Sequence, residues 1–321
     1  MIYENLTTVK DFIILGFPGL NPAYYGIVSA ILFITYMVIL FGNVFILLFI
    51  GLEKRLYKPT YLIFCNLAMN DLLFGTVTLP KMIFRYWWDD KLISFTSCFT
   101  QMYFIHSLGA SNSQLLLIMA LDRFIAICLP LKYPLLITNK TVSIACGLSC
   151  IGTFVRMVAI ILHALSLPYC NSNIIVQLYC DHGSVTNLAC GGNVKYVQMV
   201  ALSSAMFSLL LPLTFIIVSY ISIFIAVLRV TNVKGVYKTL STCTPQVFIS
   251  CLYYLPRCFV YLANTVGFSF NVDIRILLIL MYSLIPCAVN PTIYCLKTKQ
   301  IKDILMKKLK NTKAGIKSNA K

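Results

Sequence analysis

Seven long apolar stretches, separated by short polar segments, make up most of this sequence. The hydrocarbon core of a bilayer is about 30 Å thick, and an α-helix needs roughly 20 residues at 1.5 Å per residue to cross it. Each stretch is long enough to do so. The pattern therefore predicts an all-α membrane protein, a bundle of seven transmembrane helices, whose spans lie near residues 23–51, 58–84, 97–128, 139–167, 196–229, 239–266 and 273–296.

The third stretch has a distinct feature at each end. It contains no Asp, Glu, Lys or Arg between Phe99 and Leu121. Cys98 precedes this apolar run, and an acid and a base, Asp122 and Arg123, follow it directly. A cysteine at one end and two adjacent opposite charges at the other are typical of the two faces of a membrane.

Composition favours a membrane protein over a soluble one. Hydrophobic residues make up 59% of the chain and charged residues only 11%, against roughly 25% in soluble domains. The net charge is +16, and nine lysines lie within residues 297–321, as the positive-inside rule expects of a cytoplasmic segment. No nucleic-acid-binding motif or aromatic-rich basic patch accompanies them, so nucleic acid is not an expected partner.

The charges of the connecting segments predict the orientation. Basic residues follow the first, third, fifth and seventh spans, and acids gather in the opposite loops. We therefore expect one domain in the plasma membrane, with an extracellular N-terminus (1–22), the helix bundle (23–296) and a cytoplasmic amphipathic helix and tail (297–321) that contacts lipid. No cleaved signal peptide is expected. Asn5 begins a glycosylation sequon on the outer side.

Four of the thirteen cysteines fall on the predicted outer face. An even number in an oxidising compartment predicts two disulfides, and the spacing leaves three pairings open. No C-x-x-C pair or Cys/His cluster indicates a metal site. The four are Cys98, Cys170, Cys180 and Cys190.

Asp71 lies deep in the second span, where an ionisable side chain is expensive. Asn43 and Asn290 are plausible partners from the first and seventh spans. One interpretation is a polar cluster that fixes helix packing. The other is a proton or cation site, with Na⁺ as the candidate ion, coupled to a conformational switch.

His106 and Arg257 are the most individual polar residues within the spans. Gly109 and Ala110 leave space beside His106, and Arg257 shares a helical face with Tyr254 and Tyr261. Buried bases beside small residues predict the wall of a ligand pocket. The alternatives are a histidine satisfied within the core and an arginine that reaches the interface or pairs with a carboxylate.

Several motifs then resemble those of odorant receptors, specifically their class I (fish-like) branch within the rhodopsin-like G-protein-coupled receptors. Asn290–Tyr294 fits the NPxxY motif, and Leu121–Phe124 the DRY-type motif. Met119–Cys128 is similar to the MAYDRYVAIC signature of odorant receptors. Further matches are Leu56–Tyr61 (LHxPMY), Ser219-Tyr220 (SY), Lys238–Cys243 (KAxSTC) and the segments Pro168–Cys170, Tyr179–His182 and Lys297–Ile301.

The resemblance implies roles for particular residues. It pairs Cys98 with Cys180 and Cys170 with Cys190. It also implies an odorant pocket between helices three, five, six and seven, without a cofactor, and a G protein of the olfactory stimulatory type that raises cyclic AMP. The implied coupling and switch residues are Asp122, Arg123, Tyr220, Lys238, Asn290, Pro291 and Tyr294. The expected pocket walls, chosen by helical face and family position, include Ser204, Phe207, Tyr254, Cys258 and Tyr261.

The chain departs from the family pattern at four positions. Phe124 replaces the tyrosine of the DRY motif, and Gln246 stands where a histidine is common. Asn112 replaces the glutamate frequent in class I relatives, which removes one acid near Asp71 and should weaken cation binding there. Thr265 stands where many relatives carry an arginine, while Arg257 lies about two turns deeper.

These observations lead to a functional hypothesis and make its alternatives less favoured. Arg257 and His106, as two buried groups that can be cationic, should favour an anionic or strongly hydrogen-bonding ligand. The alternatives are another rhodopsin-like receptor for a small molecule or a transporter. A light receptor would need a lysine between Asp273 and Leu296, and an amine receptor would need a carboxylate near His106; the sequence has neither. A transporter would be expected to show an internal repeat, and none is visible. The chain carries no HExxH motif or nucleophile elbow and is not expected to be an enzyme.

Overall fold

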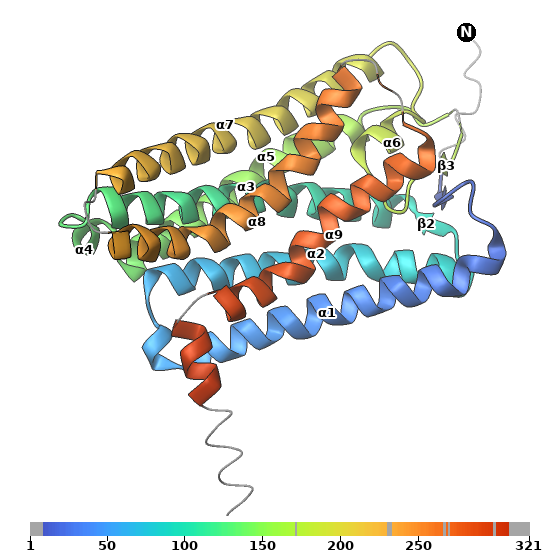
Figure 1. The fold of residues 1–321 in the computed structure, drawn as a ribbon. Coiled ribbons are helices and arrows are strands. Elements are labelled where there is room, and N and C mark those ends of the chain that lie inside the picture. The colour runs from blue at the N-terminus through green and yellow to red at the C-terminus, as the bar shows by residue number, and fades with distance from the viewer. Residues whose placement is uncertain are drawn as a thin grey trace, which may run out of the picture.

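Long α-helices lie side by side along the length of the molecule (Figure 1). The computed structural model describes residues 9–170, 172–229, 233–265, 268, 270–297 and 300–307. The predicted glycosylation site Asn5 and the side chains of Lys238 and Tyr261 lie outside this description. The long helices are α1 (Tyr25–Leu52), α2 (Pro59–Trp87), α3 (Phe95–Cys128), α5 (Asn139–Leu165), α7 (Val194–Leu228), α8 (Val233–Thr265) and α9 (Val272–Lys297).

When only the described residues are considered, six of these helices, all except α8, are long and apolar enough to cross a membrane. The remaining helix, α8, has 33 residues and packs between α7 and α9 while also touching α3. The predicted span near 239–266 therefore begins earlier, at Val233. Each other helix begins and ends within a few residues of its predicted bounds, because the apolar length needed to cross a bilayer leaves little freedom.

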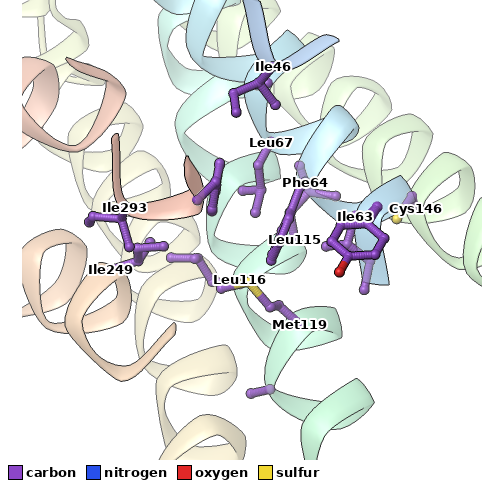
Figure 2. Packing of buried hydrophobic residues seen from close by; sticks show 14 of the residues in the cluster. Ile46, Ile63, Phe64, Leu67, Leu115, Leu116, Met119, Cys146, Ile249 and Ile293 are labelled. Carbon is purple, nitrogen blue, oxygen red and sulfur yellow. The ribbon is translucent and has the colours of Figure 1, made fainter. Parts of the chain in front are cut away.

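Helix α3 is central in the bundle, since it packs against α2, α5, α7 and α8. Figure 2 shows Leu115, Leu116 and Met119 of α3 meeting Phe64 and Leu67 of α2. In lipid, contacts of this kind hold helices together through close packing rather than through exclusion of water. Side chains from α1, α5, α8 and α9 complete the same cluster, including Ile46, Cys146, Ile249 and Ile293 (Figure 2).

Local sequence explains where the helices begin and how closely they approach. Ser94 caps α3 by accepting a hydrogen bond from the Ser97 amide at 3.2 Å, and Thr138 forms a capping box with Thr141 at the start of α5. Gly75 of α2 lies against Ile39 of α1, where an added Cβ would stand only 2.9 Å from the nearest side-chain carbon. A glycine at this position therefore permits the close contact between α1 and α2.

The polar segments at one end of the bundle form a small β-sheet that the sequence did not predict. Strand β1 (Asp11–Ile14) lies between β2 (Leu92–Ser94), to which it is antiparallel, and β3 (Ile174–Ile175), to which it is parallel. Arg85 of α2 holds this strand, because its Nε and Nη2 donate to the carbonyls of Ile14 and Leu15 at 3.0 and 2.9 Å. Strands this short carry no periodicity from which they can be predicted.

The same end of the bundle carries two disulfides, Cys98–Cys180 and Cys170–Cys190, and we call it the disulfide end. These are the two pairs that the family resemblance implies. Cys98 lies in the first turn of α3, so its bond to Cys180 draws the loop before α7 over the bundle. This loop also contains the short helix α6 (His182–Thr186).

The opposite end contains Arg123, and we call it the Arg123 end. It carries the short helix α4 (Tyr133–Leu136) and a helical segment, residues 300–307, that follows α9 (Figure 1). The predicted amphipathic helix is therefore present, but its apolar side packs on protein. Ile301 is fully buried in the core cluster, and the Tyr61 hydroxyl of α2 donates to Gln300 Oε1 at 2.7 Å.

Candidate functional site

A cavity of about 500 Å³ opens between the helices near the disulfide end. Its walls come from α3, α5, α7, α8 and α9 together with Phe74 of α2. The disulfide-tied loop also lines it, with residues that lie between Tyr179 and Asn187. This volume suits a small organic molecule. The polar side chains on its wall are His106, Ser113, Tyr179, Asp181, His182, Asn187, Gln198, Ser204, Ser208, Tyr253, Arg257, Tyr282 and Ser283.

Five of the predicted pocket residues line this cavity. They are His106, Gly109, Ala110, Ser204 and Arg257. Gly109 and Ala110 leave the space on α3 that the sequence suggested. The cavity therefore lies where the small residues and the two bases predicted a pocket, although both bases are only half-buried.

Phe207 was wrongly expected in the pocket wall. Its side chain is 58% exposed on the outer surface of α7 and does not line the cavity. The lining residues Ala201, Ser204, Ala205 and Ser208 share one face of α7, and at 100° per residue position 207 falls beyond the edge of that face.

Two residues of α8 are also displaced from their expected positions. Tyr254 is buried, and its hydroxyl hydrogen-bonds Ser113 Oγ of α3 at 2.6 Å, so it joins the helices instead of lining the cavity. Cys258 does not line the cavity either. Tyr253 occupies the wall instead, because the inward face of α8 is one residue away from the one predicted.

Arg257 is held against aromatic rings. Its guanidinium carbon lies 3.8 Å from the centroid of the Tyr253 ring and 4.7 Å from that of Tyr282, and Nη1 donates to the Tyr253 carbonyl at 3.0 Å. Among the described residues, no carboxylate comes within the 4.0 Å of an ion pair with it. The cavity therefore has one wall with a positive charge that no acid of the described chain neutralises.

His106 differs from its predicted role as a second cation. Its Nε2 accepts a hydrogen bond from the His182 amide at 3.3 Å, which requires an unprotonated nitrogen. Nε2 also lies 3.6 Å from Asp181 Oδ1. The cavity thus has one cationic wall at Arg257. A second part of its lining, formed by His106, Asp181 and His182, contains hydrogen-bond acceptors and a carboxylate, and we call it the His106 wall.

Asp181 and His182 were not singled out as functional residues from the sequence. They follow Cys180, whose bond to Cys98 brings them to the mouth of the bundle. His182 is 6% exposed, and its burial, reinforced by the neighbouring His106, lowers the pKa of His182 to about 4. The sequence did contain a signal for this placement. The family resemblance implied the Cys98–Cys180 bond, and this bond brings the next two residues, Asp181 and His182, to the mouth of the pocket.

The polar cluster around Asp71 joins three helices below the cavity. Asn290 Nδ2 of α9 donates to Asp71 Oδ2 at 2.7 Å, and Asn43 Nδ2 of α1 donates to the Cys287 carbonyl at 3.1 Å. This arrangement fits the packing role. Within the described residues, several buried oxygens here and on α3 have no hydrogen-bond partner, and such oxygens are the ligands that hard cations take; they are Asp71 Oδ1, Asn43 Oδ1, Asn290 Oδ1 and Asn112 Oδ1.

At the Arg123 end, Asp122 is buried and held from three sides. Thr60 Oγ1 of α2 and the Tyr133 hydroxyl of α4 each donate to its carboxylate at 3.0 Å, and Arg123 Nη2 lies 3.6 Å away. Arg123 is therefore kept beside its own helix. The hydroxyls of Tyr220 and Tyr294 are buried and have no hydrogen-bond partner among the described residues.

The described part of the fold is a bundle of seven long helices with a cavity near one end, the architecture of a membrane receptor. The chain belongs to the olfactory receptor family, whose family model matches residues 32–312. This membership confirms the predicted seven-helix bundle and the odorant-receptor resemblance, and it confirms that the protein is not an enzyme.

Individual relatives agree with this assignment and with the class I branch. The chain is 33% identical to human olfactory receptor 52K1 over 309 residues, which is 95% of this chain and 98% of the relative. It is 35% identical to human olfactory receptor 52N2 over 312 residues, covering 95% and 94%. Human olfactory receptor 51E2 is 33% identical over 298 residues, or 92% of each chain.

Proposed function

We propose that this receptor binds an anionic odorant in the cavity and activates a stimulatory, olfactory-type G protein, which raises cyclic AMP. The N-terminus is extracellular and the C-terminus cytoplasmic in this proposal, so the cavity opens outward and Arg123 faces the G protein. The observation that supports it most is the Arg257 guanidinium. Arg257 is half-buried and has no carboxylate partner among the described residues. Removing a cation partly from water without a counter-charge is costly, and an anionic ligand supplies the missing charge.

The signalling step needs two states of the bundle. A ligand shifts such an equilibrium only if it binds one state more tightly than the other. In the described arrangement Asp122 and its partners hold Arg123, while Tyr220 and Tyr294 have unused hydroxyls. We assign this arrangement to the closed state, and in the open state Arg123 leaves Asp122 while the two tyrosines find partners.

Helix α8 is the element that connects the cavity with the Arg123 end. It carries Arg257 in the cavity wall and Gln246 about three turns nearer the Arg123 end. The Tyr253 hydroxyl donates to the Gly109 carbonyl of α3 at 2.6 Å, so α8 is fastened to α3 directly below Arg257. A ligand that binds Arg257 and displaces it also changes the Tyr253–Gly109 hydrogen bond, and with it the packing of α8 against α3.

The test is cyclic AMP in cells that express the chain, challenged with small acids, amines, alcohols and steroids. An Arg123→Ala variant and a surface-expression label are run in parallel. A response confined to the unaltered chain, with acids as the active class, supports the proposal. An equal response in cells with the Arg123→Ala variant would contradict the coupling role of Arg123, and an equal response in cells without the receptor would show that the signal does not pass through it.

A further inference from the structure

Two hydrogen-bond acceptors on the His106 wall of the cavity lie close together without a donor between them. Asp181 Oδ1 and His106 Nε2 lie 3.6 Å apart. Since Nε2 already accepts the His182 amide hydrogen at 3.3 Å, it has no proton to give to Asp181. Two acceptors therefore lie side by side without a proton between them, and a hydrogen-bond donor placed beside Asp181 Oδ1 would supply the missing proton.

His182 adds a second, independent indication. Its ring is 6% exposed and lines the cavity, and no described residue hydrogen-bonds its Nε2. A buried polar atom without a partner costs free energy, so a ligand that supplies the partner gains affinity. The other oxygen of Asp181, Oδ2, is occupied, because it accepts from the Gly183 amide at 3.1 Å at the start of α6.

The His106 wall and Arg257 lie at the same depth in the bundle. The Tyr253 hydroxyl meets the Gly109 carbonyl, which fixes one level of α8 against one level of α3. These two helices run in opposite directions (Figure 1). From that level Arg257 lies about 6 Å along α8 and His106 about 4.5 Å along α3, both toward the disulfide end, at 1.5 Å per residue.

We propose that the cavity selects a small carboxylic acid that carries a hydroxyl or ammonium donor at its other end. The carboxylate binds Arg257, and the donor binds Asp181 Oδ1 on the His106 wall. This inference rests on the proposed function, since it takes the cavity to be the ligand site. It goes further by assigning the loop residue Asp181 as a specificity determinant that rejects acids without a donor.

The test is direct binding to the purified full-length chain in detergent, measured by titration calorimetry. Straight-chain acids of several lengths are each compared with their ω-hydroxy and ω-amino counterparts. We expect at least one substituted acid to bind about tenfold more tightly than its parent, as one charge-assisted hydrogen bond allows. This comparison of ligands uses the unaltered chain and does not depend on any variant folding.

Variants locate the two contacts. Asp181→Asn keeps an N-cap for α6 and should abolish the advantage of the substituted acid, whereas Asp90→Asn, outside the cavity on a residue that pairs with Lys81, should keep it. Arg257→Leu should weaken binding of parent and substituted acids alike by about tenfold or more, and Arg275→Leu, on the exposed start of α9, should not.

The inference is overturned if parent and substituted acids bind equally at every length, if no acid binds, or if Asp181→Asn keeps the preference. Cyclic AMP assays on the same ligands separate this failure from a failure of the proposed function. Selective binding without a cyclic AMP response would contradict the signalling proposal and support the selectivity. A cyclic AMP response to acids without a preference for the substituted ones would support the signalling proposal and contradict the selectivity.

Discussion

The guanidinium of Arg257 lies over the ring of Tyr253, 3.8 Å from its centroid, and this stacking sets where the positive charge of the cavity is presented. Tyr253 is one turn earlier on the same helix, and its hydroxyl donates to the Gly109 carbonyl of α3. One side chain therefore positions the candidate ligand anchor and also fastens α8 to α3.

Changes at Tyr253 should separate these two roles. Tyr253→Phe keeps the ring, so we expect the affinity for a carboxylic acid to stay within about threefold of the unaltered chain. Tyr253→Leu removes a cation–π contact worth about 0.5–2 kcal/mol, and the affinity should fall by about tenfold. Calorimetric titration of the purified receptor measures both, with Tyr196→Leu on the exposed face of α7 as the matched control. Equal losses for Phe and Leu would show that the hydroxyl, and not the ring, positions Arg257.

Weakening the hold on Asp122 should raise signalling without ligand. Tyr133→Phe removes one of the two hydroxyl donors to the Asp122 carboxylate, and such bonds to a charged group contribute about 1.5–3 kcal/mol. If the bond exists only in the closed state, the open population, and with it basal cyclic AMP, should increase by about tenfold or more. Tyr57→Phe, an exposed tyrosine near the same end, should leave the basal level unchanged. A basal level that does not rise in Tyr133→Phe would mean that Asp122 is held equally in both states.

Removing Arg85 should release the N-terminal strand. Arg85 is 2% exposed and binds Ile14, Leu15 and Asp89, the last at 2.6 Å. The Arg85→Met substitution removes these charge-assisted hydrogen bonds. We therefore expect the free energy of local opening of the strand to fall by about 2–4 kcal/mol. Hydrogen exchange of residues 11–15 measures this loss, and Arg55→Met, an exposed arginine, is the control. Unchanged protection of the strand would show that the sheet alone holds it.

The stability of the receptor should fall on acidification because of His182. Burial lowers the pKa of His182 to about 4 from an ordinary value of 6.5. Between these values the unfolded chain binds a proton that the folded chain does not, so stability is lost as the pH falls from about 6.5 to 4, with a full effect on the order of 3 kcal/mol. Thermal unfolding at pH 7 and pH 5 should show a smaller decrease in His182→Gln than in the unaltered chain. The exposed His163→Gln should behave like the unaltered chain, and a His182→Gln variant that loses as much stability would contradict the assignment.

The helices were predictable from sequence, because a bilayer requires both a minimum apolar length and backbone hydrogen bonds made within each segment. The same reasoning placed His106 and Arg257 at the pocket. It could not fix the rotation of each helix, since an all-apolar helix in lipid lacks a polar face that marks its outside. Phe207 and Tyr254 were therefore assigned to the wall, although the wall is formed by Ser208 and Tyr253.

The loop residues that line the cavity could not be predicted, because their positions depend on contacts between distant parts of the sequence. Asp181 reaches the cavity because Cys180 is bonded to Cys98 and because β3 pairs with the N-terminal strand. Nothing in the local sequence marks Arg85, which is buried because it lies beneath that strand and binds its carbonyls. Both depend on segments distant in sequence, and periodicity reports only on neighbours along the chain.

The central claim is that an anion at Arg257 opens the Arg123 end of the receptor. The most direct measurement is the cyclic AMP concentration–response to an active carboxylic acid and to its uncharged methyl ester, in cells expressing the unaltered chain, Arg257→Leu or Arg123→Ala at matched surface levels. We predict that the acid acts on the unaltered chain at concentrations about tenfold lower than the ester, that Arg257→Leu removes this difference, and that Arg123→Ala gives no response. An ester as potent as the acid, or a difference that persists in Arg257→Leu, would contradict the account.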